Sequence, residues 1–330
     1  SNTEQIDLAN AFVNDQPNNA SLLAGGEGLV DSDSYDGGFS ETTTASFSVD
    51  ASIGAIDGDA TSEKTVAAYQ FNIGLSTSFT GEDSLDIAID SGSDAPAATA
   101  DDPLAFDTGA ALSVDGVTYS FPLGGMSMLV GFDTDISSVF TGACTYSAFT
   151  DWMSNCGTDL SNGVAGGGVT VAGSYAFDSG FSIAAGVSGT SDSSAGLLTK
   201  EGDDYYGIEA AYTADSWGVS VAYTSDDNAA AAETTYWGVN ANYSFDIADV
   251  SVGFETEETS GTDQTGYFVG LTFPEVGPGS VSIAAGTSEN FTDAQTEYMV
   301  YEASYSYPVN DGLTITPGVF IEEKAGDDLT

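Results

Sequence analysis

The chain has 330 residues with 51 acidic side chains, three lysines and no histidine, which gives a formal net charge of −48. This charge excludes a nucleic-acid-binding protein, because contact with phosphate requires a basic surface. The lack of histidine excludes Ser–His–Asp and Cys–His catalysis, and no zinc-site or phosphate-binding motif stands out, so an enzyme is not expected. No run of 18 apolar residues occurs, so no transmembrane helix is expected. The 40 glycines and 11% aromatic residues are typical of an all-β protein.

Residues 1–38 differ from the rest of the chain and are predicted to form a separate N-terminal segment. The apolar spacing in residues 4–14 (EQIDLANAFVN) predicts one short helix, and the polar, glycine-rich stretch that follows is typical of a linker. Within this stretch, Asp31, Asp33 and Asp36 resemble half of a calcium-binding loop, but the distal bidentate glutamate is missing at the required spacing. These three aspartates are a weak metal candidate, and other acidic loops could hold calcium in the same manner.

From residue 42 onward, apolar and polar residues alternate with a period of two. For example, Ala45 and Phe47 alternate with Ser46 and Ser48. Successive side chains of a strand point to opposite faces, so each such segment has one apolar face and one polar face. Many segments have the length of about ten residues that a tilted strand needs to cross a bilayer. The fifteen predicted segments are 42–55, 66–80, 84–90, 112–121, 126–134, 167–177, 181–189, 205–213, 217–224, 234–245, 249–257, 265–273, 280–287, 297–307 and 312–322.

The connections between these segments alternate between short and long. Short turns are predicted at residues 81–83, 122–125, 178–180, 214–216, 246–248, 274–279 and 308–311. Longer loops are predicted at residues 56–65, 91–111, 135–166, 190–204, 225–233, 258–264 and 288–296. This rhythm is typical of an up-and-down barrel with tight periplasmic turns and long outer loops. Aromatic residues also gather at strand ends beside the short turns, where an interfacial girdle belongs.

These observations predict an all-β fold, namely a transmembrane up-and-down antiparallel β-barrel over residues 39–330. About 16 strands are expected, because single-chain bacterial barrels have an even number of strands. Fifteen are visible, so either a closing strand follows Thr330, or one of the segments 84–90 and 112–121 is not a separate strand. A soluble β-sandwich also has alternating strands, but its apolar face would be richer in Leu, Ile and Val, and its connections would not alternate in length.

Several blocks of the sequence resemble cyanobacterial outer-membrane porins of the surface-layer-homology type. FSETTTASFSVDASIGAIDG (39–58), LSTSFTGEDSL (75–85) and VTYSFPLGG (117–125) resemble parts of that family's barrel, and YEASYSYPVNDGLTITPGVF (301–320) is similar to its penultimate hairpin. AFVND (11–15) resembles the region after the family's peptidoglycan-binding module. The resemblance implies a homotrimeric barrel in a bacterial outer membrane, of the Gram-negative type and of cyanobacterial origin, that passes inorganic ions and small solutes. Related barrels carry basic residues, whereas this chain has almost none.

If the apolar partners face lipid, the polar partners line the lumen, and the acids among them become candidates for the pore wall. These acids are Asp50, Asp86, Asp90, Asp133, Glu209, Glu255, Glu302 and Glu322. The lysines at positions 64, 200 and 324 fall in or beside long loops, so the lumen is expected to be negative throughout. Charged rings of one sign select the opposite ion, so the channel is expected to favour cations. For any single acid, the alternative is a solvated wall residue.

The loop at residues 135–166 is the longest, and it is expected to narrow the pore, as the third loop of trimeric porins commonly does. Its acids and cysteines are Asp135, Asp151, Asp159, Cys144 and Cys156. In an exported protein the two cysteines predict one disulfide, whereas in a cytosolic protein they would be free thiols. Such a bond would hold the constriction in one shape; the alternative is an ordinary staple on an external loop.

The sequence therefore predicts a porin for passive diffusion of small hydrophilic solutes and inorganic ions, selective for cations through its acidic lumen. One alternative is an acidic, β-rich cell-surface structural protein or adhesin that binds calcium through its loops. Another is a plugged, substrate-specific barrel, which the mainly Gly, Ser, Thr, Asn and acidic lumen face disfavours. The excess of acids also has a simpler explanation, adaptation to salt water, where acids keep a surface hydrated.

Overall fold

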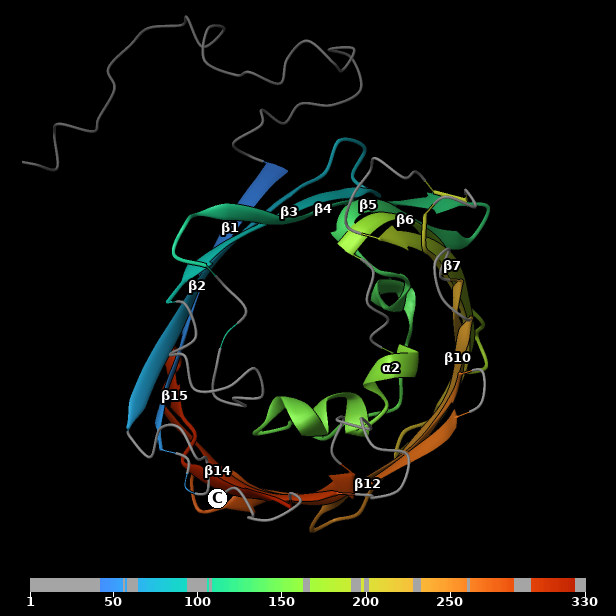
Figure 1. Cartoon of the computed structure of the whole chain (residues 1–330). Coiled ribbons are helices and arrows are strands. Elements are labelled where there is room, and N and C mark those ends of the chain that lie inside the picture. The colour runs from blue at the N-terminus through green and yellow to red at the C-terminus, as the bar shows by residue number, and fades with distance from the viewer. Residues whose placement is uncertain are drawn as a thin grey trace, which may run out of the picture.

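The protein forms a single antiparallel β-sheet in which strands that are neighbours in sequence are neighbours in space. The computed structural model describes residues 42–55, 57, 65–93, 106, 109–162, 167–190, 197–198, 202–227, 233–259, 262–287 and 298–323. The predicted N-terminal segment, with Asp31, Asp33 and Asp36, lies outside the described residues. The sheet curls into a ring, and the segment between residues 135 and 162 lies inside it (Figure 1).

The sheet is 16-stranded, and its strands run in sequence order around the ring. They are β1 Thr43–Gly54, β2 Val66–Thr77, β3 Ser84–Gly92, β4 Ser113–Leu123, β5 Met126–Thr134, β6 Gly167–Ala176, β7 Phe181–Thr190, β8 Asp204–Thr213, β9 Trp217–Asp227, β10 Thr234–Ser244, β11 Asp249–Thr259, β12 Thr262–Val276, β13 Gly279–Thr287, β14 Met299–Asn310, β15 Leu313–Ile315 and β16 Gly318–Glu322. The predicted all-β, up-and-down antiparallel architecture is confirmed.

The last predicted segment, residues 312–322, corresponds to two short strands. Both β15 and β16 pair with β14, and Pro317 lies between them. Proline has no N–H to donate to a ladder, so the pairing is interrupted there, although the Pro317 carbonyl still accepts from the backbone N–H of Tyr305 at 2.9 Å. Segments 84–90 and 112–121 are both separate strands. Among the described residues no ladder joins β1 to β15 or β16, and a closing strand stays a prediction.

The apolar side chains of the strands lie on the outer face of the ring. Val239 of β10 is paired with Val221 of β9 on one side and with Phe254 of β11 on the other, and all three are exposed. Their chain neighbours, such as Asn240, are buried. Apolar side chains outside and polar side chains inside are the inverse of the arrangement in a soluble protein. They suit a β-barrel whose wall contacts the hydrocarbon of a membrane. Within the described residues, no helix is long and apolar enough to span a membrane.

Aromatic rings lie close together at the ends of strands beside the short turns. Phe177 and Phe181 flank the turn between β6 and β7 with ring centroids 5.5 Å apart, and Tyr212 and Trp217 flank the next short turn at 5.0 Å. Tyr212 and Trp217 combine an apolar ring with a polar group, which suits the boundary between hydrocarbon and water, and aromatic rings in general form girdles at this boundary in membrane barrels.

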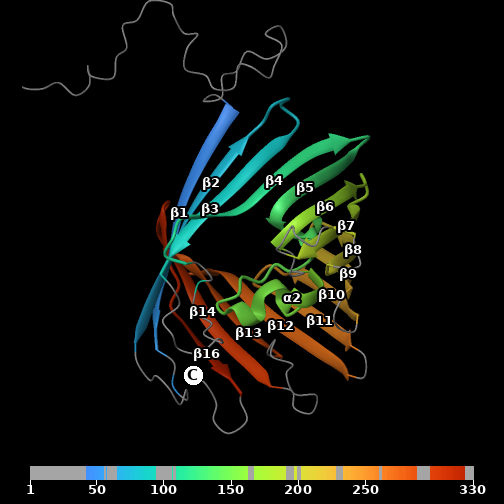
Figure 2. The same cartoon turned by 45° about the horizontal axis from the view of Figure 1, so that its top comes forward.

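The segment between β5 and β6 does not stay on the rim but enters the ring. We call residues 135–162 the inner loop; it contains the short helices η2 Ile136–Val139, η3 Asp151–Cys156 and α2 Asp159–Asn162. η2 contacts β6, β7 and β8, η3 contacts β11 and β12, and α2 contacts β9, β10 and β11. Two views show the same placement, with the loop against one side of the wall and away from β1 to β3 (Figures 1 and 2).

Candidate functional site: the inner loop and the pore wall

A disulfide closes the inner loop on itself. Cys144 and Cys156 are bonded, with their Cα atoms 5.7 Å apart, so the predicted disulfide is confirmed. For a sequence separation of 12 residues, such a bond stabilises by roughly 3 kcal/mol in chain-entropy terms. Gly157 follows η3 with a φ of 64°, a left-handed conformation that favours glycine. The disulfide and the turn at Gly157 therefore constrain residues 144–157 independently of their contacts with the wall.

Glu302 of β14 anchors the middle of the inner loop. Its carboxylate accepts hydrogen bonds from the Tyr146 hydroxyl at 2.9 Å and from the backbone N–H of Phe149 at 2.9 Å. It also accepts from the backbone N–H of Thr150 at 2.9 Å and from the Thr150 hydroxyl at 2.7 Å. These four donors match the approximately four lone-pair sites of an ionised carboxylate. Glu302 is only 4% exposed, so its hydrogen-bonding capacity is taken up by the loop.

Two further glutamates anchor the ends of the inner loop. Glu209 of β8 accepts from the backbone N–H of Thr141 at 2.6 Å and of Gly142 at 2.7 Å, one bond to each oxygen. Glu255 of β11 accepts from the backbone N–H and the hydroxyl of Ser161, both at 2.6 Å. Glu209 and Glu255 are 3% and 2% exposed. The three glutamates sit on every third strand, so they hold the loop at well-separated points along the wall.

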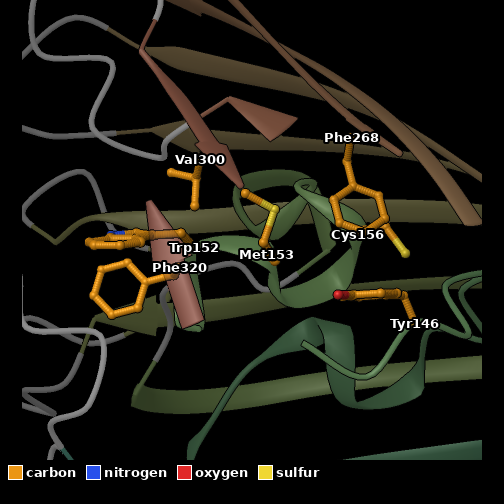
Figure 3. Packing of buried hydrophobic residues seen from close by; sticks show 7 residues of the cluster. All are labelled: Tyr146, Trp152, Met153, Cys156, Phe268, Val300 and Phe320. Carbon is orange, nitrogen blue, oxygen red and sulfur yellow. The ribbon is translucent and has the colours of Figure 1, made fainter. Parts of the chain in front are cut away.

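Apolar packing supports the same contact between loop and wall. Figure 3 shows the cluster, whose members are Tyr146, Trp152, Met153 and Cys156 of the loop and Phe268, Val300 and Phe320 of the wall. The rings of Tyr146 and Phe268 meet edge to face at 5.2 Å, and those of Trp152 and Phe320 at 5.5 Å. Burial of Tyr146, the nearby charge of Glu302 and their hydrogen bond raise the pKa of Tyr146 well above its ordinary value. Tyr146 therefore stays a proton donor to Glu302 throughout the neutral range.

Glycines make the wall flat where the loop rests on it. A Cβ placed on Gly253 would overlap the carbonyl oxygen of Cys156, and one on Gly238 would overlap the hydroxyl of Ser161. A Cβ on Gly286 would lie 3.3 Å from the sulfur of Met153. Since larger side chains at these positions would push the loop into the lumen, the glycines contribute to the free width of the pore.

The wall on the other side of the ring is polar and is not covered by the described part of the inner loop. Asp50 of β1 is exposed and accepts from the Asn72 amide at 3.4 Å, while Asn72 in turn accepts from the Gln70 amide at 2.8 Å. Asp86 of β3 is half-buried and accepts from the Ser84 hydroxyl at 2.7 Å. Both aspartates therefore remain at least partly exposed.

The remaining predicted wall acids are placed differently from one another. Asp90 of β3 is buried and accepts from the Ser113 hydroxyl at 3.0 Å. Asp133 is exposed, with a φ of 51°, where the register of β5 against β6 shifts. Glu322 of β16 is buried and is paired in register with Val300.

The predicted loop acids also divide into two kinds. Asp135 caps η2 by accepting from the backbone N–H of Ser137 at 2.7 Å, and Asp159 accepts from the side chains of Ser154 and Asn155. Asp151 is exposed at the start of η3. No lysine, arginine or histidine occurs among the described residues, and Lys64, Lys200 and Lys324 lie outside them. No group of three or more Asp, Glu or Cys side chains in the described part could hold a metal ion.

The family model for Gram-negative porins matches residues 108–319. The chain belongs to the Gram-negative porin family. This porin is therefore a passive channel of the outer membrane rather than an enzyme. No curated protein matches it in sequence.

Solved structures agree with the fold of this porin at low sequence identity. A variant of the porin of Rhodopseudomonas blastica is 12% identical, with a TM-score of 0.55, over 87% of this chain and 96% of that one. A second variant of the same porin, with the same TM-score of 0.55, is 14% identical over 87% and 97% of the two chains. A loop L8 deletion mutant of OmpT, an outer membrane protein of Vibrio cholerae, has a TM-score of 0.59 at 11% identity over 87% and 97%.

The part of the wall on which the inner loop rests was not predicted from the sequence, although the sequence of this porin carries a signal for it. In most strands the inward positions are small or polar, but Phe268, Val300 and Phe320 place large apolar side chains in that phase. An apolar residue on the wet face of a barrel strand has to be covered by something inside the lumen. Those three positions mark the covered part of the wall.

Proposed function

We propose that this porin is a cation-selective diffusion channel for inorganic ions and small hydrophilic solutes. The observation that carries the proposal is the sign of the charge around the lumen. Asp50 and Asp86 lie on one side, Asp151 lies on the inner loop, and no basic side chain occurs among the described residues. Rings of one charge sign concentrate the opposite ion and repel ions of their own sign.

The width of the water path strengthens this effect. Electrostatic screening in salt solution acts over about 8 Å at physiological ionic strength, so an acid on the wall influences ions over much of a narrow lumen. The inner loop narrows the ring and brings passing ions closer to both walls (Figure 1). The polar, small side chains between the acids are compatible with hydrated solutes, and the part of the wall that the structure describes shows no stacked aromatic path for a specific sugar.

We also propose that the channel works as a homotrimer with its long loops outside and its short turns in the periplasm. Support comes from the blocks at 39–58, 75–85, 117–125 and 301–320, which resemble cyanobacterial porins and favour an outer membrane of that origin. The short turns at one end and the long connections at the other are typical of this orientation.

Selectivity is tested in planar bilayers with the wild-type protein and a KCl gradient across the membrane. The expected reversal potential has the sign of cation selectivity, and its magnitude falls as total salt rises, because screening shortens the reach of the wall charges. A reversal potential of zero or of anion-selective sign would overturn the proposed selectivity. Light scattering on the detergent-solubilised protein reports the oligomer; a monomer mass would contradict the trimer.

A further inference from the structure

We propose that the inward acids of this porin have two separate roles: glutamates position the inner loop, and aspartates on the opposite wall set the ion selectivity. The positioning residues are Glu209, Glu255 and Glu302. The selectivity residues are Asp50 on β1 and Asp86 on β3. The role of Asp50 and Asp86 rests on the proposed cation-selective function, whereas the role of the three glutamates rests on loop geometry alone.

The glutamates cannot contact a passing ion, because the inner loop covers them. Each is at most 4% exposed, and each accepts at least two hydrogen bonds from loop donors at 2.6 to 2.9 Å. A hydrated cation would have to displace backbone N–H groups to reach these oxygens, and each unmet buried donor costs about 1–3 kcal/mol. Their carboxyl oxygens are therefore occupied by loop donors rather than by ions from the lumen.

The aspartates have no such cover from the described part of the chain. Asp50 is exposed and Asp86 half-buried, and their neighbours across the strands are hydroxyl and amide groups. The amide chain from Gln70 through Asn72 ends on Asp50, so its donors point toward the carboxylate and hold it in place. Asp90 is buried against Ser113 and is therefore not assigned to this role.

Their position within the ring separates the two sets as well. The glutamates lie on β8, β11 and β14, on the side where the loop rests, while β1 and β3 lie across the lumen from it (Figure 1). An ion excluded from the loop-covered side passes along β1 to β3. The exposed Asp151 of the inner loop faces water, so ions meet acids from both the loop and the open wall.

The test compares double variants that each replace two carboxyl groups with amides of the same shape. The wall variant is Asp50→Asn with Asp86→Asn, the anchor variant is Glu209→Gln with Glu255→Gln, and the control is Asp178→Asn with Asp246→Asn in two exposed short turns. Each is purified as the full chain and recorded in planar bilayers for reversal potential and for current noise in the open state. Resistance of the folded band to heating in gels shows that each variant has inserted as a barrel.

In the wall variant, the cation-to-anion permeability ratio is expected to fall by roughly twofold or more, while the current noise stays at the level of the wild type. The anchor variant is expected to keep the ratio close to that of the control and to show frequent changes in current, because the loop ends are released. An equal loss of selectivity in the wall and anchor variants would overturn the division of roles. So would a wall variant with the ratio of the control.

Two further outcomes separate this inference from the proposed function. If the wild type itself does not favour cations, the proposed function fails, but loop positioning is still supported when the anchor variant is noisy. Wild-type current noise in the anchor variant refutes loop positioning whatever the selectivity of the wild type. If the anchor variant does not insert, the single variant Glu209→Gln replaces it, because it releases the loop only at Thr141 and Gly142 and should still raise the current noise. Wild-type noise in that single variant would count against the positioning role.

Discussion

Glu302 and Thr150 are 152 residues apart in the chain, yet Thr150 donates both its backbone N–H and its hydroxyl to the Glu302 carboxylate, at 2.9 and 2.7 Å. Both residues are buried. This relationship joins the tip of an internal loop to the fourteenth strand of the wall. The shape of the channel lumen therefore depends on a contact between distant parts of the sequence.

Replacing Thr150 with valine removes the hydroxyl donor and keeps the shape of the side chain. Hydrogen bonds to charged groups contribute about 1.5–3 kcal/mol, so the loop is expected to detach from the wall more often. This motion increases the low-frequency current noise without changing the selectivity. Single-channel recording measures the noise. Thr150→Ser, which retains the hydroxyl, serves as the control, and equal noise in the two variants would contradict the prediction.

Reduction of the Cys144–Cys156 disulfide is expected to raise conductance noise by loosening the loop, whose closure stabilises by roughly 3 kcal/mol. The mean conductance should change less, because Glu209 and Glu255 still hold the chain on the two sides of the closed segment. The measurement is a single-channel record before and after a thiol reductant. A Cys144→Ser, Cys156→Ser double variant is the control, since it should be noisy from the start and insensitive to reductant. Unchanged wild-type traces after verified reduction would rule out this role.

Phe268→Ala tests the apolar contact between the wall and the inner loop. Phe268 is 1% exposed against Tyr146 and Met153, so its truncation leaves a cavity and costs about 3–5 kcal/mol. A lower thermal unfolding midpoint in detergent and noisier currents are expected. Phe254→Ala is the matched control, because Phe254 is 46% exposed on the outer face of the neighbouring strand. The prediction fails if the two variants behave alike in both measurements.

Asp83→Asn tests the turn between β2 and β3. Burial raises the pKa of Asp83, but hydrogen bonds from Ser78, Tyr119 and Thr80 outweigh it and hold the pKa well below its usual value. A depressed pKa in the folded state gives stability that is present above the unfolded value of 3.8 and is lost as the pH falls toward the folded value. The wild type should therefore unfold at a higher temperature than Asp83→Asn at pH 7.

The difference between the two midpoints is expected to shrink steadily below about pH 4, where the unfolded carboxyl becomes protonated. Unfolding is followed by circular dichroism in detergent between pH 7 and pH 2. Comparing the two proteins at each pH cancels the contribution of the other acids. A midpoint difference that stays constant over this range would show that the Asp83 charge does not stabilise the turn.

Most of the architecture could be predicted from the sequence because it depends on local regularities. Alternation with a period of two identifies each strand and its outer face, as in Phe47 and Val49, and it needs no knowledge of neighbouring strands. The lengths of the connections then order the strands, since a two- to six-residue turn can only join adjacent antiparallel strands. The pair Cys144 and Cys156 lies within one connection, so their bond was also within reach of sequence reasoning.

The tertiary structure alone decided what each inward acid does. Glu255 and Asp50 occupy the same polar phase of their strands, yet one is buried under the inner loop and the other is exposed to the lumen. The strand period places both side chains inside the ring but contains no information about which arc of the wall a loop will cover. That arc is determined by hydrogen bonds between residues 67 to 156 positions apart, such as Gly142 with Glu209 and Tyr146 with Glu302, and by the glycines that leave room for the loop.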